Sequence, residues 1–475
     1  MNGRVSHQNY TAAEIDGLFA RHHRLHFIGI GGSGMYPLVQ ILLERGYAVT
    51  GSDVLEGDIV GYERALGIDV AVGPQRPENL GDAELVIYTA ALLDDNPELL
   101  AAREKGLPCL ERSQVLGYVS RLFADAVCIA GTHGKTTATS MLTQIFLEAG
   151  RDPGAVVGGK LSVIGGYGRM GAGALCVIEA CEFVDTFLQL SPDTAVILNV
   201  DADHLDYFGT LDNVVRSFQR FAAMAARMVG LNGDDANTLR AAEGLTQRRV
   251  TFGRSPNNDY YPVDEAAGAR AGWSFTLCRR GEPLGRVRLR VPGRHNVLNA
   301  TAAAAVALEY GVSPEDTLAA LGRFAGAARR FELLGHVRGA DVADDYAHHP
   351  AELRATLLAA REMGYRRIWA VFQPFTYSRT AALLDDFADA LQLADHVVLT
   401  EIMGSRERNT YHIHSSDLAA KIPGAVVLPD FPAIDAYVRA RVGEGDLVLT
   451  MGCGNVYGVA KLLCAGRSAP TADED

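Results

Sequence analysis

The stretch Val127-Cys128-Ile129-Ala130-Gly131-Thr132-His133-Gly134-Lys135-Thr136-Thr137 decides the fold of this chain. An apolar run ends in a glycine-bracketed loop, and a helical pattern through Met141, Leu142, Ile145 and Phe146 follows. Strand, loop and helix in this order are typical of a phosphate-binding loop, because backbone N–H groups and a helix N-terminus attract phosphate. Lys135 adds a positive charge, and the Thr136 hydroxyl is a candidate Mg²⁺ ligand.

The loop departs from the strict G-x-x-x-x-G-K-[ST] pattern, because Ile129 stands where the first glycine belongs. The alternative interpretation is a glycine-rich turn with a solvated lysine. The order of strand, loop, Lys-Thr and helix favours the phosphate-binding interpretation.

A second glycine loop lies near the N-terminus. The strand Leu25–Ile28 runs into Gly29, Gly31 and Gly34, and the next strand ends at Asp53, about 20 residues later. This is a complete Rossmann-type fingerprint, with the acid placed to reach a ribose hydroxyl. It indicates NAD binding on its own, or else a βαβ unit whose glycines serve only close packing.

Size and composition limit the possible functions. A chain of 475 residues is too long for one hydrophobic core and suggests about three domains. A net charge of −13 argues against a nucleic-acid or anionic-membrane surface. The seven irregularly spaced cysteines indicate reduced thiols. Without a secretory leader or an apolar run of about 18 residues, we expect a cytoplasmic protein with no membrane insertion.

The alternation of strands and helices predicts an α/β fold with three doubly wound, Rossmann-like domains. We place them at residues 1–123, 124–328 and 329–475. The central domain is of the ATPase type and carries a β-rich segment, 249–292, expected to form a small antiparallel appendage. The acidic tail from Ser468 is expected to be disordered.

Two polar residues follow apolar strands of the central domain, Glu179 and His204. Carboxyl ends of parallel strands share one edge of a sheet, so both can face the Lys135 loop. A carboxylate and an imidazole there suit Mg²⁺ on a triphosphate. Glu179 can instead form an ion pair at the sheet edge, and His204 can be a turn histidine.

Seven ordered segments resemble the motifs of the Mur ligase family: 131–137, 179–182, 203–206, 295–299, 329–331, 344–350 and 373–380. The run Asp344-Asp345-Tyr346-Ala347-His348-His349-Pro350 and the N-terminal glycine loop are the most diagnostic pieces. The resemblance extends over residues 24–464. It implies an ATP-dependent amide ligase that joins L-alanine to the lactyl carboxylate of UDP-N-acetylmuramate through an acyl phosphate, in peptidoglycan precursor synthesis.

The resemblance also implies roles for individual residues. Lys135, Glu179, His204 and Arg330 would be catalytic. Two Mg²⁺ ions would be held by Thr136, Glu179 and His204. The other implied contacts are ATP at Gly131, Thr132, Gly134, Lys135, Thr136, Thr137, His295, Asn296, Asn299, Arg330 and Asp345; the UDP-sugar at Gly31, Gly32, Ser33, Gly34, Met35, Asp53 and Thr89; and the amino acid at Tyr346, His348, His349 and Arg379.

Some positions depart from the family pattern. No lysine occurs between His204 and Arg227, so the carbamylated lysine of several other members is absent, which favours the alanine-adding members. Phe375 stands where the family often carries His, and Thr376 where some members have Arg. Cys181 replaces an acid, and Thr89-Ala90-Ala91 replaces a more serine-rich contact.

Three rival functions remain open from the sequence. The first is a related ligase that adds another amino acid or a recycled tripeptide. The second is a nicotinamide-dependent oxidoreductase that uses the Gly29–Gly34 loop, although it leaves Lys135 unexplained. The third is a silent binding module, against which the complete set of candidate catalytic residues argues. We expect a monomer or weak homodimer.

Overall fold

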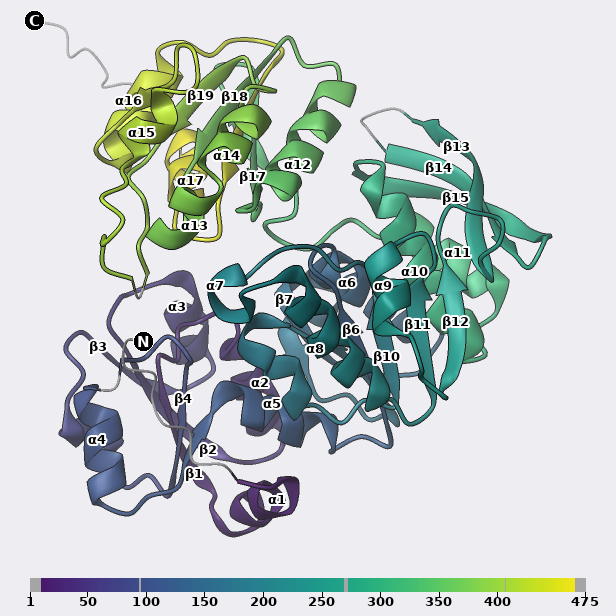
Figure 1. The fold of residues 1–475 in the computed structure, drawn as a ribbon. Coiled ribbons are helices and arrows are strands. Elements are labelled where there is room, and N and C mark those ends of the chain that lie inside the picture. The colour runs from purple at the N-terminus through teal and green to yellow at the C-terminus, as the bar shows by residue number, and fades with distance from the viewer. Residues whose placement is uncertain (1–9, 94, 269–271, 406, 466–475) are drawn as a thin grey trace, which may run out of the picture. The chain divides into compact units, whose positions relative to one another are not determined.

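The computed structural model describes residues 10–93, 95–268, 272–405 and 407–465. Three β-sheets occur in this part of the chain, with helices between their strands (Figure 1). The chain forms two compact units. The first holds residues up to Glu265 with Ser274–Arg288 and Val297–Ala327, and the second holds the other described residues. Among the helices described, none is long and apolar enough to cross a membrane.

The first sheet confirms the doubly wound pattern near the N-terminus. Its strand order is β3-β2-β1-β4-β5, with all neighbours parallel. Along β4, Leu85 and Ile87 face one hydrophobic core and Val86 and Tyr88 face the other, as the two-residue repeat of a strand requires. The elements are α1 Ala12–Arg21, β1 Arg24–Ile28, α2 Tyr36–Glu44, β2 Ala48–Asp53, α3 Asp58–Ala65, β3 Asp69–Val72, β4 Leu85–Tyr88, α4 Pro97–Glu104, β5 Cys109–Glu111 and α5 Arg112–Ser120.

The second sheet has ten strands in the order β15-β14-β13-β12-β11-β10-β6-β9-β7-β8. Its strands are β6 Asp125–Ala130, β7 Gly154–Leu161, β8 Gly166–Arg169, β9 Leu175–Glu179, β10 Thr194–Ile197, β11 Met228–Asn232, β12 Arg248–Phe252, β13 Tyr260–Ala267, β14 Gly272–Arg279 and β15 Glu282–Pro292. Its α-helices are α6 Lys135–Glu148, α7 Leu205–Phe208, α8 Leu211–Ala223, α9 Ala236–Ala241, α10 His295–Glu309 and α11 Pro314–Arg323.

The β-rich segment differs in one respect from the sequence-based expectation. Strand β12 pairs in parallel with β11, so it extends the parallel part of the sheet and does not belong to an antiparallel appendage. The hairpin lies further along the chain, where the two residues Arg280 and Gly281 connect β14 to β15. A connection this short joins only antiparallel strands.

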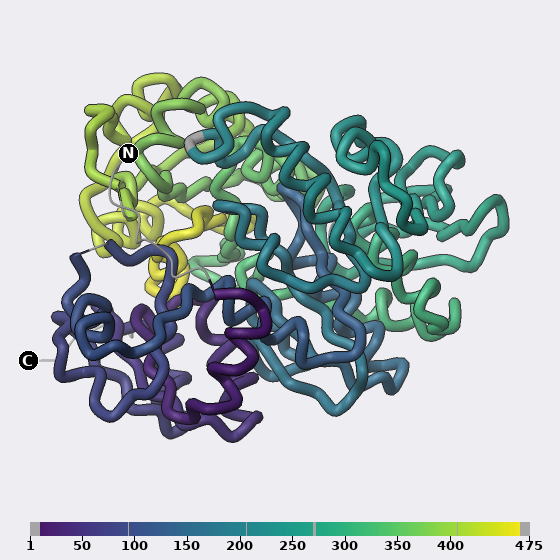
Figure 2. Tube along the Cα trace, turned by 60° about the horizontal axis from the view of Figure 1, so that its bottom comes forward, coloured from purple at the N-terminus to yellow at the C-terminus, as the bar shows by residue number. Residues whose placement is uncertain are grey.

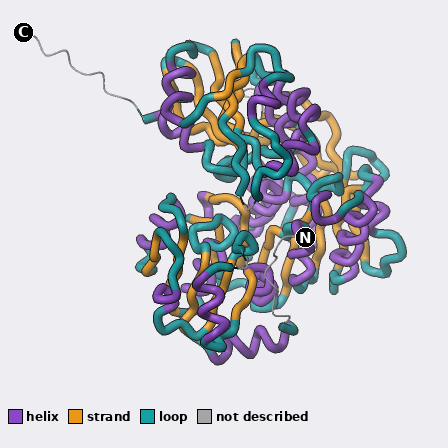
Figure 3. The backbone as a smooth tube through the Cα atoms, turned by 60° about the vertical axis from the view of Figure 1, so that its left-hand side comes forward, coloured by secondary structure: helices purple, strands orange, loops and turns teal. Residues whose placement is uncertain are grey.

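The third sheet has the order β16-β17-β21-β18-β19-β20, and only its edge strand β16 is antiparallel to its neighbour. Leu447 and Leu449 of β21 face one core and Val448 faces the other, so helices cover both faces (Figure 3). The elements are β16 Glu332–Val337, β17 Ala340–Asp345, α12 Pro350–Glu362, β18 Arg367–Phe372, α13 Tyr377–Ala382, α14 Leu384–Leu391, β19 His396–Leu399, α15 Ser415–Ala419, β20 Val426–Val427, α16 Phe431–Arg439, β21 Asp446–Met451 and α17 Tyr457–Cys464. The expected disordered tail from Ser468 lies outside the described residues.

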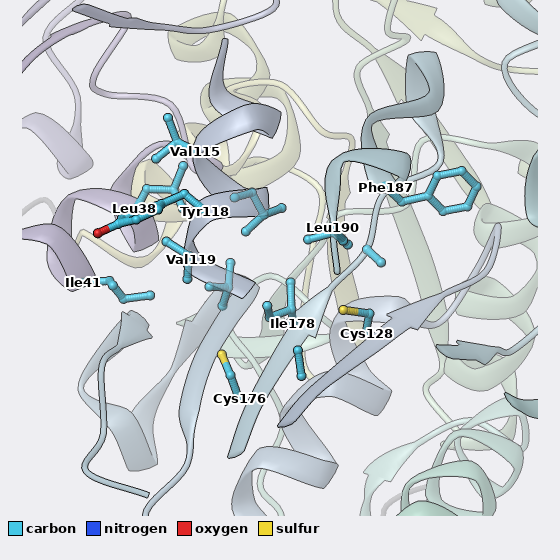
Figure 4. Packing of buried hydrophobic residues seen from close by; sticks show 14 of the residues in the cluster. Leu38, Ile41, Val115, Tyr118, Val119, Cys128, Cys176, Ile178, Phe187 and Leu190 are labelled. Carbon is cyan, nitrogen blue, oxygen red and sulfur yellow. The ribbon is translucent and has the colours of Figure 1, made fainter. Parts of the chain in front are cut away.

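One hydrophobic core joins the first two sheets. Figure 2 shows the purple and blue N-terminal part of the chain continuing directly into the blue-to-teal part that carries the second sheet. Figure 4 shows Leu38 of α2 and Val119 of α5 in the same cluster as Ile178 of β9. Polar contacts add to this packing, because Gln40 Oε1 accepts hydrogen bonds from the backbone N–H groups of Tyr167 (3.1 Å) and Gly168 (3.0 Å). The glycine loop and the Lys135 loop are therefore held by one packed body.

Candidate active site

The Lys135 loop connects β6 to α6, as the sequence predicts. Two of its glycines have positive φ, 144° at Gly131 and 84° at Gly134, where side chains are strained. A Cβ at Gly131 would approach Leu198 Cβ to 2.9 Å, and one at Gly134 would approach Asn299 Oδ1 to 2.5 Å. The structure therefore places Asn299, a predicted ATP contact, directly against the loop.

The Lys135 side chain folds back over its own loop. Its Nζ donates to the carbonyl oxygens of Gly131 (2.5 Å) and Thr132 (3.1 Å) and forms an ion pair with Glu182 Oε2 (2.9 Å). Burial lowers the pKa of the Lys135 ammonium, but the Glu182 carboxylate outweighs burial and holds this pKa above its usual value. Lys135 is therefore a charged group whose carboxylate partner a nucleotide phosphate can replace.

Glu182 was not predicted as a site residue. It is the last residue of the segment 179–182 that resembles a family motif, and the sequence assigned it no role. Its side chain is 2% exposed, and its partner Lys135 is 47 residues away in the chain. The available signal was an acid placed shortly after a strand end that faces a phosphate-binding loop.

Glu179 and Thr136 form the candidate Mg²⁺ site. Thr136 Oγ1 donates to Glu179 Oε1 at 2.9 Å, and the backbone N–H of Gly158 donates to Glu179 Oε2 at 2.6 Å. A Cβ at Gly158 would lie 2.6 Å from both carboxylate oxygens, so glycine leaves room for them. One carboxylate and one hydroxyl fit Mg²⁺, which usually takes few protein ligands and completes its shell with water and substrate phosphates.

His204 precedes α7 with a left-handed backbone, φ 53°. Its Nε2 lies 3.6 Å from Asp203 Oδ2, and its ring lies 4.7 Å from that of Phe183. Within the described residues, no three His, Cys, Asp or Glu side chains gather as a metal site. A second Mg²⁺ ion at His204 stays a prediction.

The first-domain glycine loop contacts Asp53 and Thr89, two of the residues predicted at the UDP-sugar. Asp53 Oδ2 accepts a hydrogen bond from the N–H of Gly31 at 2.9 Å, and its Oδ1 accepts one from Leu55 at 3.2 Å. Gly29 has φ 78°, and a Cβ there would lie 2.5 Å from Thr89 Cγ2. Asp53 therefore orders the loop, in addition to its predicted place at the UDP-sugar.

Behind this loop lies a buried acid that the sequence analysis did not single out. Glu63 of α3 is 0% exposed, and neither carboxyl oxygen has a hydrogen-bond partner among the described residues. Burial, with a smaller contribution from Asp53, raises the pKa of Glu63 to about 8. Glu63 is therefore protonated in the folded protein at neutral pH.

Because Glu63 is buried, we expect the unfolding free energy to decrease as pH rises. The variant Glu63→Gln should remove this decrease. The folded protein retains the Glu63 proton up to about pH 8, whereas the unfolded chain loses it near pH 4.5. Between these values, the unfolding free energy of the wild type should fall by about 1.4 kcal/mol per pH unit relative to Glu63→Gln. Urea unfolding at pH 5.5, 6.5 and 7.5 measures this difference, with the exposed-site variant Glu104→Gln as control. Parallel pH profiles for wild type and Glu63→Gln would contradict it.

The second unit brings together the predicted residues after β17. Asp345 is buried, and its carboxylate accepts hydrogen bonds from the N–H groups of Phe331 and Ala347 (both 2.8 Å). The guanidinium of Arg330 lies 5.2 Å from the centre of the Tyr346 ring. Asp345 thus fixes the chain on both sides of this cluster, and its contact with the ATP ribose stays a prediction.

The histidines after Tyr346 are also ordered by local contacts. His348 Nδ1 lies 3.1 Å from the Tyr346 carbonyl oxygen, and Glu352 Oε2 accepts hydrogen bonds from the N–H groups of both His348 and His349. His349 caps α12, since its Nδ1 accepts a hydrogen bond from Ala351. His349 therefore has a structural role as a helix cap, in addition to its predicted contact with the amino-acid substrate.

Arg379 lies on the short helix α13. Glu407, which our sequence analysis did not select, holds the start of this helix, because Ser378 donates to it from its N–H (2.9 Å) and its hydroxyl (2.5 Å). Thr376, just before the helix, has φ 65°.

Two predicted ATP contacts, His295 and Asn296, begin helix α10. Asn296 Nδ2 donates a hydrogen bond to the Pro292 carbonyl oxygen at 2.7 Å.

Comparison with known families gives three matches in sequence order. The model described as the catalytic domain of the Mur ligase family matches residues 24–124. The Mur ligase middle domain matches residues 129–307, and the glutamate ligase domain of Mur ligases matches residues 329–454.

Similar proteins cover nearly the whole chain. The UDP-N-acetylmuramate–L-alanine ligase of Caldanaerobacter subterraneus is 42% identical over 454 residues, which cover 94% of this chain and 98% of that protein. The ligase of the same name from Acetivibrio thermocellus is 42% identical over 449 residues and covers 92% of this chain and 95% of its own.

Solved structures also resemble this chain over more than nine-tenths of its length. A UDP-N-acetylmuramate–alanine ligase from Thermotoga maritima has a TM-score of 0.81 at 30% identity, covering 93% of this chain and 98% of that one. A murein peptide ligase from Psychrobacter arcticus has a TM-score of 0.76 at 26% identity, with the same coverage.

Proposed function

The chain belongs to the Mur ligase family, and from this premise we propose that it joins L-alanine to UDP-N-acetylmuramate at the expense of ATP. The proposal is supported by relatives of that name at 42% identity over more than nine-tenths of the chain. The observation that carries the chemistry is the Lys135 loop, where a charged lysine and the Thr136–Glu179 pair meet. The reaction belongs to peptidoglycan precursor synthesis.

The first step activates the substrate carboxylate. A lactyl carboxylate oxygen attacks the γ-phosphorus of ATP, the β–γ bond breaks, and ADP leaves while an acyl phosphate forms. Carboxylate and triphosphate repel each other, so Lys135 would exchange Glu182 for phosphate oxygens and neutralise them. Mg²⁺, held at Thr136 and Glu179, would supply further positive charge to the phosphates. Asn299 would lie beside the bound nucleotide.

The second step forms the amide. The amine of L-alanine attacks the acyl carbon and the carbon–oxygen bond to phosphate breaks. Inorganic phosphate leaves, and the proton that nitrogen gives up is taken by this phosphate. Arg379 would pair with the alanine carboxylate, since a guanidinium binds a carboxylate through two hydrogen bonds. Tyr346, His348 and His349 would line the same site, and Arg330 and Asp345 would contact ATP.

The structural similarity to a murein peptide ligase supports a second candidate function, that of a ligase that attaches a recycled tripeptide. ADP release with UDP-N-acetylmuramate and L-alanine, glycine, L-serine or tripeptide distinguishes the two. We expect the highest kcat/KM with L-alanine. Turnover with tripeptide and none with L-alanine would replace the proposal by the second candidate.

A further inference from the structure

Arg112 is a cation that the proposed function has not yet used. It is the first residue of α5 and follows β5 directly. The neighbouring Glu111 caps the same helix, since its Oε2 accepts a hydrogen bond from the Ser113 N–H at 2.7 Å. Arg112 itself is half-buried and makes no hydrogen bond or ion pair with any residue that the structure describes.

The Arg112 side chain lies against the glycine loop. A Cβ at Gly34 would lie 3.4 Å from Arg112 Cδ, 3.5 Å from Nη1 and 3.6 Å from Nε. Gly34 closes the loop that leads into α2, a nine-residue helix without a side-chain cap at its N-terminus. The guanidinium therefore flanks the loop that would hold the diphosphate of the sugar nucleotide.

A half-buried guanidinium without an acidic partner loses hydration without a compensating charge, so the arrangement favours an anionic ligand. The planar guanidinium matches a phosphate through two parallel hydrogen bonds, which an ammonium does not provide. The net charge of −13 makes this local cation more significant for holding a dianion.

We infer that Arg112 binds the diphosphate of the sugar nucleotide against Gly34. The inference rests on the proposed function, because it names a residue for that substrate. The diphosphate is favoured over the lactyl carboxylate because Arg112 contacts the glycine loop itself, whereas the carboxylate must reach the γ-phosphate at Lys135.

The test is calorimetric titration of UDP into the full-length protein and its variants. UDP carries the diphosphate and lacks the lactyl carboxylate. Arg112→Ala should raise the Kd for UDP about 10- to 100-fold, the effect of losing hydrogen bonds to a charged group. Arg112→Lys should recover only part of this loss. Arg45→Ala removes the same charge at the other end of α2, about 14 Å away, and should change Kd less than twofold.

Titration of UDP-N-acetylmuramate completes the design. If Arg112 binds the diphosphate, Arg112→Ala should raise the Kd for UDP and for UDP-N-acetylmuramate by the same factor. Unchanged UDP affinity with weakened UDP-N-acetylmuramate would overturn the inference and assign Arg112 to the carboxylate. Unchanged affinity for both would overturn it outright, while turnover by the wild type would leave the proposed function intact. A wild type that turns over UDP-N-acetylmuramate but binds no UDP would overturn the inference alone, whereas a wild type that binds neither ligand would overturn the proposed function as well.

Discussion

The variant Lys135→Ala should lower kcat for ADP release at least about a thousandfold, the upper range for removing one preorganised charge from a developing anion. Lys135 is the cation of the loop, and its ammonium is within 2.9 Å of the carboxylate that a phosphate would replace. Without it, the lactyl carboxylate would approach a less neutralised triphosphate. Steady-state kinetics with saturating ATP and L-alanine measure the loss, and Lys105→Ala, an exposed-site change, should leave kcat unaltered.

The same substitution should also destabilise the protein, and this effect can be separated from catalysis. Lys135→Ala leaves Glu182, which is 2% exposed, without its cation. Breaking one side of a buried pair costs about 3–5 kcal/mol, because the remaining charge is buried and uncompensated. Adding Glu182→Gln removes that charge, so the double variant should recover most of the unfolding free energy in urea titrations and none of the activity. Activity regained by the double variant would show that Lys135 acts only on folding.

The elements that the sequence predicted well are those with continuous apolar runs. Strands β6, β9 and β10 are buried on both faces and read as uninterrupted hydrophobic segments. Strand β7 was missed because it contains three glycines, Gly154, Gly158 and Gly159, and glycine is rare in strands. One of them is required by the site, since a Cβ at Gly158 would meet the Glu179 carboxylate.

In the candidate site, the sequence predicted contacts between residues that are close in sequence and missed those between residues that are far apart. Gly134, Lys135 and Thr136 are close in sequence, so their loop could be recognised as a pattern. The ion pair of Lys135 with Glu182 joins positions 47 residues apart, and no local spacing reveals it. The contact of Arg112 with Gly34 likewise depends on how β5 and α5 pack beside the first loop.

The variant Glu179→Gln should reduce kcat by about two to three orders of magnitude, as expected when a charge that organises a phosphate site is lost. A glutamine retains the size of the side chain and one carbonyl oxygen for the N–H of Gly158, so the local fold should persist. Its amide lacks the negative charge that attracts a hard divalent cation. We therefore expect the Mg²⁺ concentration for half-maximal rate to rise more than about tenfold, with the unfolding free energy changed by less than about 1 kcal/mol.

Mg²⁺ titration of the initial rate separates metal binding from the chemical step. Exposed-site Glu243→Gln removes the same charge from the central domain and should keep the wild-type Mg²⁺ dependence. Thr136→Val, which removes the hydroxyl that donates to Glu179 at 2.9 Å, should shift the dependence in the same direction. If Glu179→Gln lowers kcat without any change in the Mg²⁺ dependence, Glu179 positions Thr136 and the loop and does not hold the metal. Since Glu179 also accepts the Gly158 N–H, the paired titrations of both variants decide between a metal ligand and a positioning residue.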